Sequence, residues 1–335
     1  MMREPWFWRD RSLVARVVAA SLSPAAMFYD AARRYRESTA RPEAAPIPVF
    51  CVGNATVGGV GKTPFALLLS SLLGEIGVSA HFLTRGYGGA LAGPVLVDPS
   101  VHDVGAVGDE ALLLAAVAPT WVSRARARGA AAAARAGAAA IIMDDGYQNN
   151  SLAKTLSLLL IDADDPFGNG KMLPAGPLRE PPTAAVARAA AIVYIVRDKM
   201  RGLPTLESDR PTFKAWLEPI RSLDGARVLA FCGIGRPQRF FETVANAGGD
   251  IADAIAFPDH HVYSNAEIAR LKDSAKSQSA RLVTTEKDYV RLRRAAREDI
   301  EAFRVKMACD DPVRLKNLSA KAIKGFRFHA DDRHE

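Results

Sequence analysis

The stretch from Gly53 to Pro64, GNATVGGVGKTP, constrains the fold of this 335-residue chain more than any other feature. It follows an apolar run at residues 47–52 and precedes residues 65–69, a run typical of a helix. A strand, a glycine-rich loop and a helix in this order form a cradle for phosphate groups. The glycines let several backbone N–H groups face one anion, and the helix N-terminus adds its positive dipole end. The sequence therefore predicts a nucleotide-binding chain.

The loop also predicts what its residues do. Lys62 is expected to reach the β- and γ-phosphates and to act in catalysis, and the Thr63 hydroxyl is expected to ligate Mg²⁺. The other expected nucleotide contacts are Thr56, Val57, Gly58, Gly59, Val60 and Gly61. A standard Walker A sequence would have glycine in place of Thr56. The alternative, a glycine-rich surface turn, is disfavoured because Gly-Gly-x-Gly-Lys-Thr stands between a strand and a helix.

Strand-like and helix-like segments alternate after the loop. Strands are expected at residues 78–84, 121–123, 139–143, 156–161 and 191–196, with helices at 109–117 and 124–138. This alternation predicts an α/β fold, a P-loop NTPase-like doubly wound parallel sheet with its site at the C-terminal ends of the strands.

A second, smaller α/β domain is expected after a proline-rich stretch. Its strands are predicted at residues 228–232, 254–257, 281–285 and 303–307, with helices starting near residues 237 and 265. We expect three parts: an N-terminal helical segment at residues 1–44, a nucleotide-binding domain at 45–210, and the smaller domain at 211–335, which contributes to the active-site cleft.

The charge of the chain limits the kinds of partner that we expect it to bind. The net charge of +7 suits an anionic partner, and seven arginines lie within the first forty residues. The chain has no RNA-binding motif, zinc-finger spacing or aromatic–basic interleaving, so nucleic acid is not an expected partner. No obligate protein partner is evident, and the three widely spaced cysteines suit a reducing compartment.

The N-terminal segment favours contact with a membrane surface. Its aromatic triplet, Trp6-Phe7-Trp8, is flanked by arginines and followed by Leu13, Val14, Val17, Val18 and Leu22. This pattern predicts an amphipathic helix in the bilayer interface, with the aromatic residues at headgroup depth and the arginines on anionic lipid. Arg16 and Pro24 interrupt the apolar run, which is too short to span a bilayer. A secretory signal peptide is disfavoured, and a helix packed on its own domain stays open.

Three acidic positions carry candidate chemistry. Asp144 and Asp145 end an apolar strand, where a Walker B carboxylate would hold Mg²⁺ opposite Thr63, although Asp-Asp-Gly is also a good turn. Asp109 stands at a loop-to-helix junction, where it is equally well a helix cap or a base for an attacking hydroxyl. His260, past a strand of the second domain, is either a partner that orients Asp109 or a surface histidine.

A proline-rich loop at residues 174–182 carries Arg179 beside Glu180. Arg179 and Arg124 are candidates for clamping anionic groups, although most single arginines are solvated surface residues. The segment at residues 284–288, Thr-Thr-Glu-Lys-Asp, differs from the Asn-Lys-x-Asp of guanine-specific GTPases and disfavours that class.

Taken in order, these motifs resemble the tetraacyldisaccharide 4′-kinase family, the lipid A 4′-kinases of Gram-negative bacteria. The matching segments span nearly the whole chain: residues 53–64, 85–89, 108–110, 144–148, 167–170, 173–180, 231–237, 259–261 and 284–288. The family's own loop also lacks the glycine that Thr56 replaces.

The resemblance implies transfer of the ATP γ-phosphate to the 4′-hydroxyl of an acylated glucosamine disaccharide 1-phosphate, giving lipid IVA. It implies ATP and Mg²⁺ as cofactors and a monotopic enzyme on the cytoplasmic face of the inner membrane. It assigns Asp109 as the base with His260 as its partner, and Asp144 and Asp145 as metal-binding acids. Tyr87, Arg124, Arg179 and Glu180 fall on expected substrate segments.

Asn149 departs from the family pattern, which usually has histidine after Asp-Asp-Gly-x-Gln. Asparagine keeps hydrogen-bonding capacity and loses the titratable group. No catalytic role is therefore expected for it.

A membrane-associated switch ATPase that dimerises is the rival from another class. Its deviant loop requires a lysine that crosses to the partner's phosphates, at the position where this chain has Val57. That absence disfavours the rival, and the N-terminal helix disfavours a kinase of a soluble metabolite.

Overall fold

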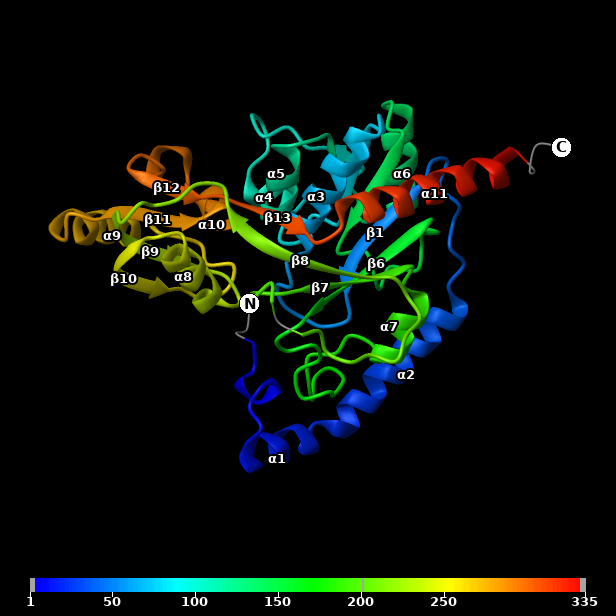
Figure 1. Cartoon of the computed structure of the whole chain (residues 1–335), viewed down its shortest axis with the longest axis horizontal. Coiled ribbons are helices and arrows are strands. Elements are labelled where there is room, and N and C mark those ends of the chain that lie inside the picture. The colour runs from blue at the N-terminus through cyan, green and yellow to red at the C-terminus, as the bar shows by residue number, and fades with distance from the viewer. Residues whose placement is uncertain (1–3, 201, 332–335) are drawn as a thin grey trace.

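Two sheets form the frame of the molecule in this computed structural model, which describes residues 4–200 and 202–331 (Figure 1). The larger sheet contains β1 (Val49–Asn54), β2 (Ala80–Thr84), β3 (Val95–Leu96), β4 (Thr120–Val122), β5 (Ala140–Asp144), β6 (Leu156–Asp162), β7 (Ala191–Ile195), β8 (Thr212–Pro219) and β13 (Val305–Cys309). Its strand order is β13-β8-β7-β6-β1-β5-β2-β4-β3. Only the β13–β8 and β3–β4 pairs are antiparallel among the described strands.

The central strands form because their sequences are nearly continuous apolar runs, as expected for parallel strands covered on both faces. Every residue of β1 is buried. On one face pack α3 (Lys62–Glu75), α5 (Asp109–Ala115) and α11 (Pro312–Asp331), and on the other pack α6 (Arg126–Arg135) and α7 (Pro182–Arg188). Helices thus cover both faces, and the predicted doubly wound parallel sheet is confirmed.

The smaller sheet has the order β10-β9-β11-β12 and is parallel throughout its described strands. Its strands are β9 (Arg227–Cys232), β10 (Asp250–Ala256), β11 (Arg281–Thr285) and β12 (Ile300–Phe303). One face is covered by α8 (Pro237–Asn246) and the other by α9 (Asn265–Ser277). The short helix α10 (Glu286–Arg291) follows β11 directly.

The chain enters and leaves this smaller unit through strands of the larger sheet. Both β8 and β13 pair in the large sheet, so the strands of the small unit lie within residues 227–303. The division expected at residue 211 therefore differs from the observed pairing. The single strand expected at residues 303–307 is two strands, β12 and β13, which join different sheets on either side of Arg304. A local apolar pattern indicates a strand without indicating which sheet it joins.

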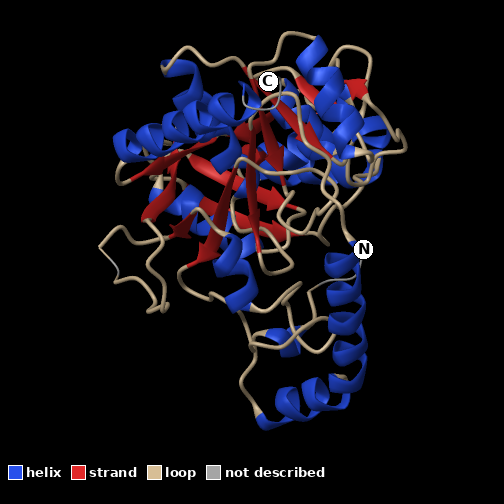
Figure 2. Ribbon diagram, turned by 90° about the vertical axis from the view of Figure 1, so that its right-hand side faces the viewer, coloured by secondary structure: helices blue, strands red, loops and turns tan. Residues whose placement is uncertain are grey.

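The N-terminal residues form an arm that extends away from the sheets (Figure 2). It consists of a short 3₁₀ turn, η1 (Trp6–Trp8), and the helices α1 (Leu13–Ser21) and α2 (Ser23–Thr39). Ser12 caps α1 by accepting a hydrogen bond from Ala15 N at 3.2 Å, and Pro24 lies in the first turn of α2. Across the described ranges, no helix combines the length and apolar character that crossing a bilayer requires.

Candidate active site

The phosphate loop connects β1, the strand between β6 and β5, to the first residue of α3. Gly58 and Gly61 adopt positive φ angles of 111° and 88°, which residues with a side chain rarely adopt. Gly53 is required for another reason: a Cβ there would meet the Tyr147 Cβ at 2.6 Å. The backbone of this loop therefore depends on its glycines.

Lys62 lies over its own loop. Its Nζ donates to Asn54 Oδ1 at 3.2 Å and to Gly58 O at 3.3 Å, and lies 3.6 Å from Asp145 Oδ1. Asn54 is itself held, because its Nδ2 donates to both Thr56 O and Thr56 Oγ1 at 2.9 Å. The ammonium group is thus positioned at the loop where phosphates are expected.

Thr56 and Val57 are engaged by other parts of the protein. Thr56 is buried, and the Val57 N–H donates to Pro177 O at 2.8 Å. Since this N–H already has a protein acceptor, it is not among the groups aimed at a phosphate. These two residues instead attach the loop to the segment around Pro177.

Thr63 and Asp144 form the candidate magnesium site. Thr63 Oγ1 donates to Asp144 Oδ2 at 2.8 Å, while Asp144 Oδ1 is buried with no hydrogen-bond partner in the described structure. Burial and the nearby negative charges of Glu110 and Asp145 raise the pKa of Asp144. An unpartnered buried carboxylate oxygen beside a hydroxyl fits a hard cation that takes oxygen ligands.

The protein offers few side-chain ligands at this candidate magnesium site. No cluster of three or more His, Cys, Asp or Glu side chains in the described chain has the spacing of a metal site. That finding is compatible with Mg²⁺, which is usually held by one or two carboxylates together with substrate phosphates and waters.

Asp145 faces cations rather than Thr63. It has a positive φ of 49°, and its Oδ1 accepts from Arg179 Nη1 at 3.0 Å as well as lying near Lys62. Burial raises its pKa, but the charges of Lys62 and Arg179 outweigh burial and lower the pKa to about 2. Asp145 is therefore ionised at neutral pH and holds the two cations at the phosphate loop.

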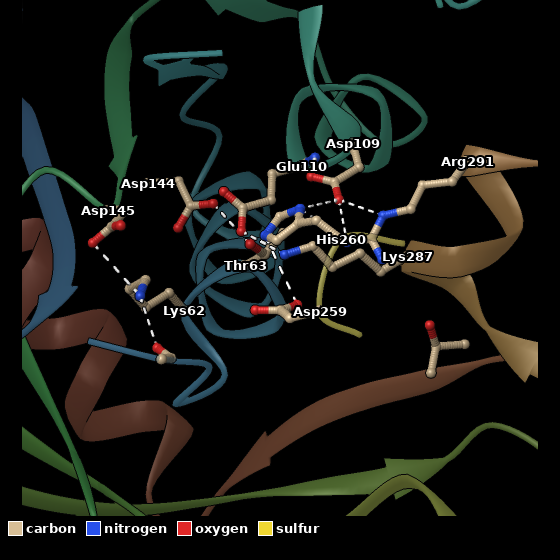
Figure 3. Close-up of polar contacts among 12 residues, drawn as sticks. Lys62, Thr63, Asp109, Glu110, Asp144, Asp145, Asp259, His260, Lys287 and Arg291 are labelled. Carbon is tan, nitrogen blue, oxygen red and sulfur yellow. Dashed lines mark hydrogen bonds and ion pairs between the residues drawn. The ribbon is translucent and has the colours of Figure 1, made fainter. Parts of the chain in front are cut away.

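Asp109 lies where the large and small units meet (Figure 3). Asp109 is the first residue of α5, after Gly108, and its side chain is only 3% exposed. His260 of the small unit, in the loop after β10, places its Nδ1 3.1 Å from Asp109 Oδ2. His260 Nε2 lies 3.9 Å from Asp259. The structure thus brings together the two residues that the sequence argument paired.

Two further residues of the small unit meet these acids, and the sequence argument missed both. Arg291 Nε donates to Asp109 Oδ2 at 2.7 Å, and its Nη2 contacts the same oxygen. Lys287 Nζ donates to Glu110 Oε1 at 2.9 Å. They stand four residues apart on α10 and so share one helix face. That spacing, which begins at Lys287 within the segment at residues 284–288, was the signal available in the sequence.

Arg291 is also fixed within its own unit. Its Nη1 donates to Gly233 O at 2.6 Å and to Asp288 Oδ1 at 2.9 Å. Burial raises the pKa of Asp109, but the hydrogen bond from His260 and the charges of Lys287 and Arg291 outweigh it and hold that pKa well below its usual range. The Asp109 carboxylate is therefore ionised and fixed from the other unit.

The expected substrate residues divide into two groups. The Tyr87 ring is half exposed and lies 5.8 Å from the His260 ring, centroid to centroid. Arg124 is exposed and donates to Gly89 O at 3.4 Å, in the same loop as Tyr87. Tyr87 thus lies beside His260, and Arg124 is joined to the loop that carries Tyr87. Arg179 belongs to the Asp145 pair described above.

Glu180 is the exception and corrects the expectation of a substrate contact. It is fully buried, accepts from Gln148 Nε2 at 2.8 Å and pairs with Arg188. The same Gln148 nitrogen donates to Asn54 O at 2.8 Å. Glu180 therefore supports the end of β1 from inside the protein.

Asn149, where the family usually has histidine, stabilises its own turn. Its Oδ1 accepts from Ser151 N at 3.2 Å and from Ser151 Oγ at 3.1 Å.

Comparisons with known proteins identify the family of this chain. The family model described as tetraacyldisaccharide-1-P 4′-kinase matches residues 18–323. A tetraacyldisaccharide 4′-kinase from Rhodospirillum centenum is 47% identical over 334 residues, covering 98% of this chain and 99% of the relative. One from Methylobacterium sp. is 47% identical over 335 residues, covering 97% and 99%.

A solved structure is similar as well. LpxK from Aquifex aeolicus, crystallised in complex with ATP, superimposes with a TM-score of 0.76 at 27% identity. The match covers 91% of this chain and 99% of that one.

Proposed function

Because the chain belongs to the tetraacyldisaccharide 4′-kinase family, we propose that it transfers the ATP γ-phosphate to the 4′-hydroxyl of a tetraacylated glucosamine disaccharide 1-phosphate. The chain is a kinase of lipid A biosynthesis, and the product of this transfer is lipid IVA. The observation that carries the mechanism is the contact of His260 and Arg291 with Asp109 across the two units.

Asp109 is the proposed general base. As the 4′-oxygen forms its bond to the γ-phosphorus and the bond to the β,γ-bridging oxygen breaks, Asp109 takes the hydroxyl proton and ADP leaves. Ion pairing keeps Asp109 in its ionised, proton-accepting form at neutral pH. His260 orients the carboxylate and, lying beside the exposed Tyr87, borders the space in which a sugar would stand.

The phosphate side of the reaction falls to Lys62 and the loop glycines. Lys62 supplies positive charge at the β- and γ-phosphates, while Asp145, which also pairs with Arg179, holds it in place. Thr63 and Asp144 would hold Mg²⁺, which offsets the negative charge of the phosphates. Tyr87 and Arg124 are the proposed substrate contacts.

Membrane contact is assigned to the arm. Its helices expose Leu13, Val14, Val17, Met27 and Phe28 to solvent, and Arg16 and Arg34 lie beside them. An exposed apolar face with neighbouring arginines suits the interface of an anionic bilayer. We assign the enzyme to the cytoplasmic face of the inner membrane, where ATP is available. There the apolar face of the arm would contact lipid.

Label transfer tests the reaction. Detergent-solubilised protein, Mg²⁺ and γ-labelled ATP are offered the tetraacyl disaccharide 1-phosphate, with Asp109→Asn as the control variant. We expect label in the lipid with the parent protein and a large loss with the variant. Hydrolysis of ATP without labelled lipid would contradict the proposed acceptor.

Flotation with phosphatidylglycerol vesicles tests the membrane assignment. Val17 in the arm and Val117 after α5 are 61% and 63% exposed, so Val17→Glu and Val117→Glu change equally accessible residues at different places. Only Val17→Glu is expected to weaken vesicle binding, because it places a charge on the proposed lipid face. Equal binding by both variants would contradict the assignment.

A further inference from the structure

Two tryptophans of the arm have opposite environments. Trp6 is 56% exposed, whereas Trp8, two residues later, is 6% exposed. The Trp8 indole Nε1 donates to Pro174 O at 3.0 Å, and the Trp8 backbone oxygen accepts from Asn169 N at 2.8 Å. The headgroup position expected for all three aromatic residues is therefore wrong for Trp8, which packs on the protein instead.

The segment that receives Trp8, residues 168–179, is a compact strap. It is held by its own hydrogen bonds: Asn169 Nδ2 donates to Ala175 O at 2.9 Å, and Gly176 N donates to Met172 O at 2.9 Å. Gly168 lies between Trp8 and the far end of the strap, since a Cβ there would meet Pro177 Cγ at 2.6 Å and Trp8 O at 2.9 Å.

The other edge of the strap is bonded to the phosphate loop. Pro177 O accepts from Val57 N at 2.8 Å, and Arg179 N donates to Ala55 O at 2.8 Å. Between them, Leu178 forms an antiparallel bridge with Thr56. The strap thus has Trp8 on one edge and the nucleotide-binding backbone on the other.

We propose that Trp8 is a positioning residue for nucleotide binding, acting through the strap on the phosphate loop. The inference rests on the proposed function only in taking residues 58–63 as the ATP site. The indole–Pro174 bond holds the strap, and the strap holds Ala55 and Val57 at the start of the loop. Only four residues separate Trp8 from α1, so the lipid-facing arm and the ATP site share one short connection.

The expected effect is on nucleotide affinity. Without the indole bond, the strap gains freedom to leave the loop, and the loop must be ordered when ATP binds. Loss of this partly buried hydrogen bond predicts a rise of about three- to tenfold in the Kd for ATP. The rate of the bound complex should change less, because Trp8 does not touch Asp109, Lys62 or Thr63.

Direct binding of a fluorescent ATP analogue to the full chain in detergent micelles provides the test, since it needs no acceptor lipid. Trp8→Phe keeps an aromatic ring at this position while removing the N–H donor and the second ring of the indole, and Trp8→Ala removes the aromatic packing altogether. Trp6→Ala is the matched control at the exposed tryptophan. Thermal unfolding of each variant shows whether it is folded at the assay temperature.

We expect Trp8→Phe to raise the Kd and Trp8→Ala to raise it further, with Trp6→Ala binding the nucleotide like the parent. If Trp8→Ala does not fold, Trp8→Phe and Asn169→Ala, which loosens the strap from within, decide the question. Folded Trp8 variants with the parent's Kd would overturn the proposal. A failure of label transfer to lipid in the parent protein would overturn the proposed acceptor and leave this result standing.

Discussion

The phosphate loop and the α10 side of the small unit build their parts of the site in different ways. Lys62 and Thr63 are neighbours on one short segment, and the loop's own glycines and Asn54 fix their positions. Asp109 is held by His260 and Arg291, which lie more than 150 residues away in the sequence and in a different unit.

The contrast shows where each half is vulnerable. The phosphate-binding half is determined by local backbone geometry, so a steric change at a glycine should damage it. The proton-accepting half is determined by charges that meet across a boundary, so removing one charge should damage it. The following predictions test this difference, from the largest expected effect to the smallest.

Asp109→Asn should give the largest effect on rate. The amide keeps the shape of the side chain and cannot accept the hydroxyl proton, so kcat should fall by about 10²–10⁴. The affinity for ATP should stay near that of the parent, because the phosphate loop is untouched. Steady-state kinetics together with nucleotide binding check both parts, and parent-like turnover would remove Asp109 from the mechanism.

Arg291→Met should give the largest effect on stability. It leaves the buried Asp109 and Asp288 carboxylates without their shared cation, and breaking a buried pair costs about 3–5 kcal/mol. Lys62→Met is the matched control, since Asp145 keeps Arg179 as a partner. Urea denaturation measures both variants, and equal losses would show that the two halves do not differ in this way.

Gly53→Ala should damage the phosphate-binding half by steric means. The added Cβ meets Tyr147 at 2.6 Å, and overpacking of this kind costs about 1–3 kcal/mol. Gly59→Ala is the control, because a Cβ there has no described heavy atom within 4 Å and the residue does not have a positive φ. Denaturation curves should separate the two, and an unchanged midpoint for Gly53→Ala would count against the close approach.

The pH dependence of stability should show the smallest effect. The pKa of Asp145 is about 2 in the folded chain, against about 4 when unfolded, so its ion pairs stabilise the fold above pH 4. This contribution should be lost as the pH falls from about 4 to 2. Asn tolerates the positive φ at this position, so Asp145→Asn is a suitable comparison.

Unfolding measured across that pH range should therefore show the parent losing its advantage over Asp145→Asn on acidification. A constant difference between the two proteins down to pH 2 would mean that Asp145 is not paired as described.

The sequence allowed the phosphate-binding half and the sheet class to be predicted because both depend on contiguous patterns. The loop glycines, Thr63 and the strand ending at Asp144 each carry a local signal. For Arg291 the local signal is only its spacing from Lys287 on α10, since an arginine at the end of a short helix is ordinarily solvated and its tertiary position makes it a partner of Asp109.

Two other features could not be predicted from a local sequence pattern. The sequence around Glu180 predicts a polar loop residue, yet Glu180 is buried and bonded to Gln148 and Arg188. The strand at residues 305–309 has the same apolar character as β12 and joins the other sheet. In each case the deciding contact is made by a residue far away in the chain.

The measurement that tests the central claim most directly is a double-variant cycle on Asp109 and His260, read as kcat under saturating ATP. If the two side chains act as one unit across the boundary, Asp109→Asn with His260→Ala should lose about as much activity as Asp109→Asn alone. Losses that multiply would mean that the two residues act independently, and would contradict the account of a base held in place by the small unit.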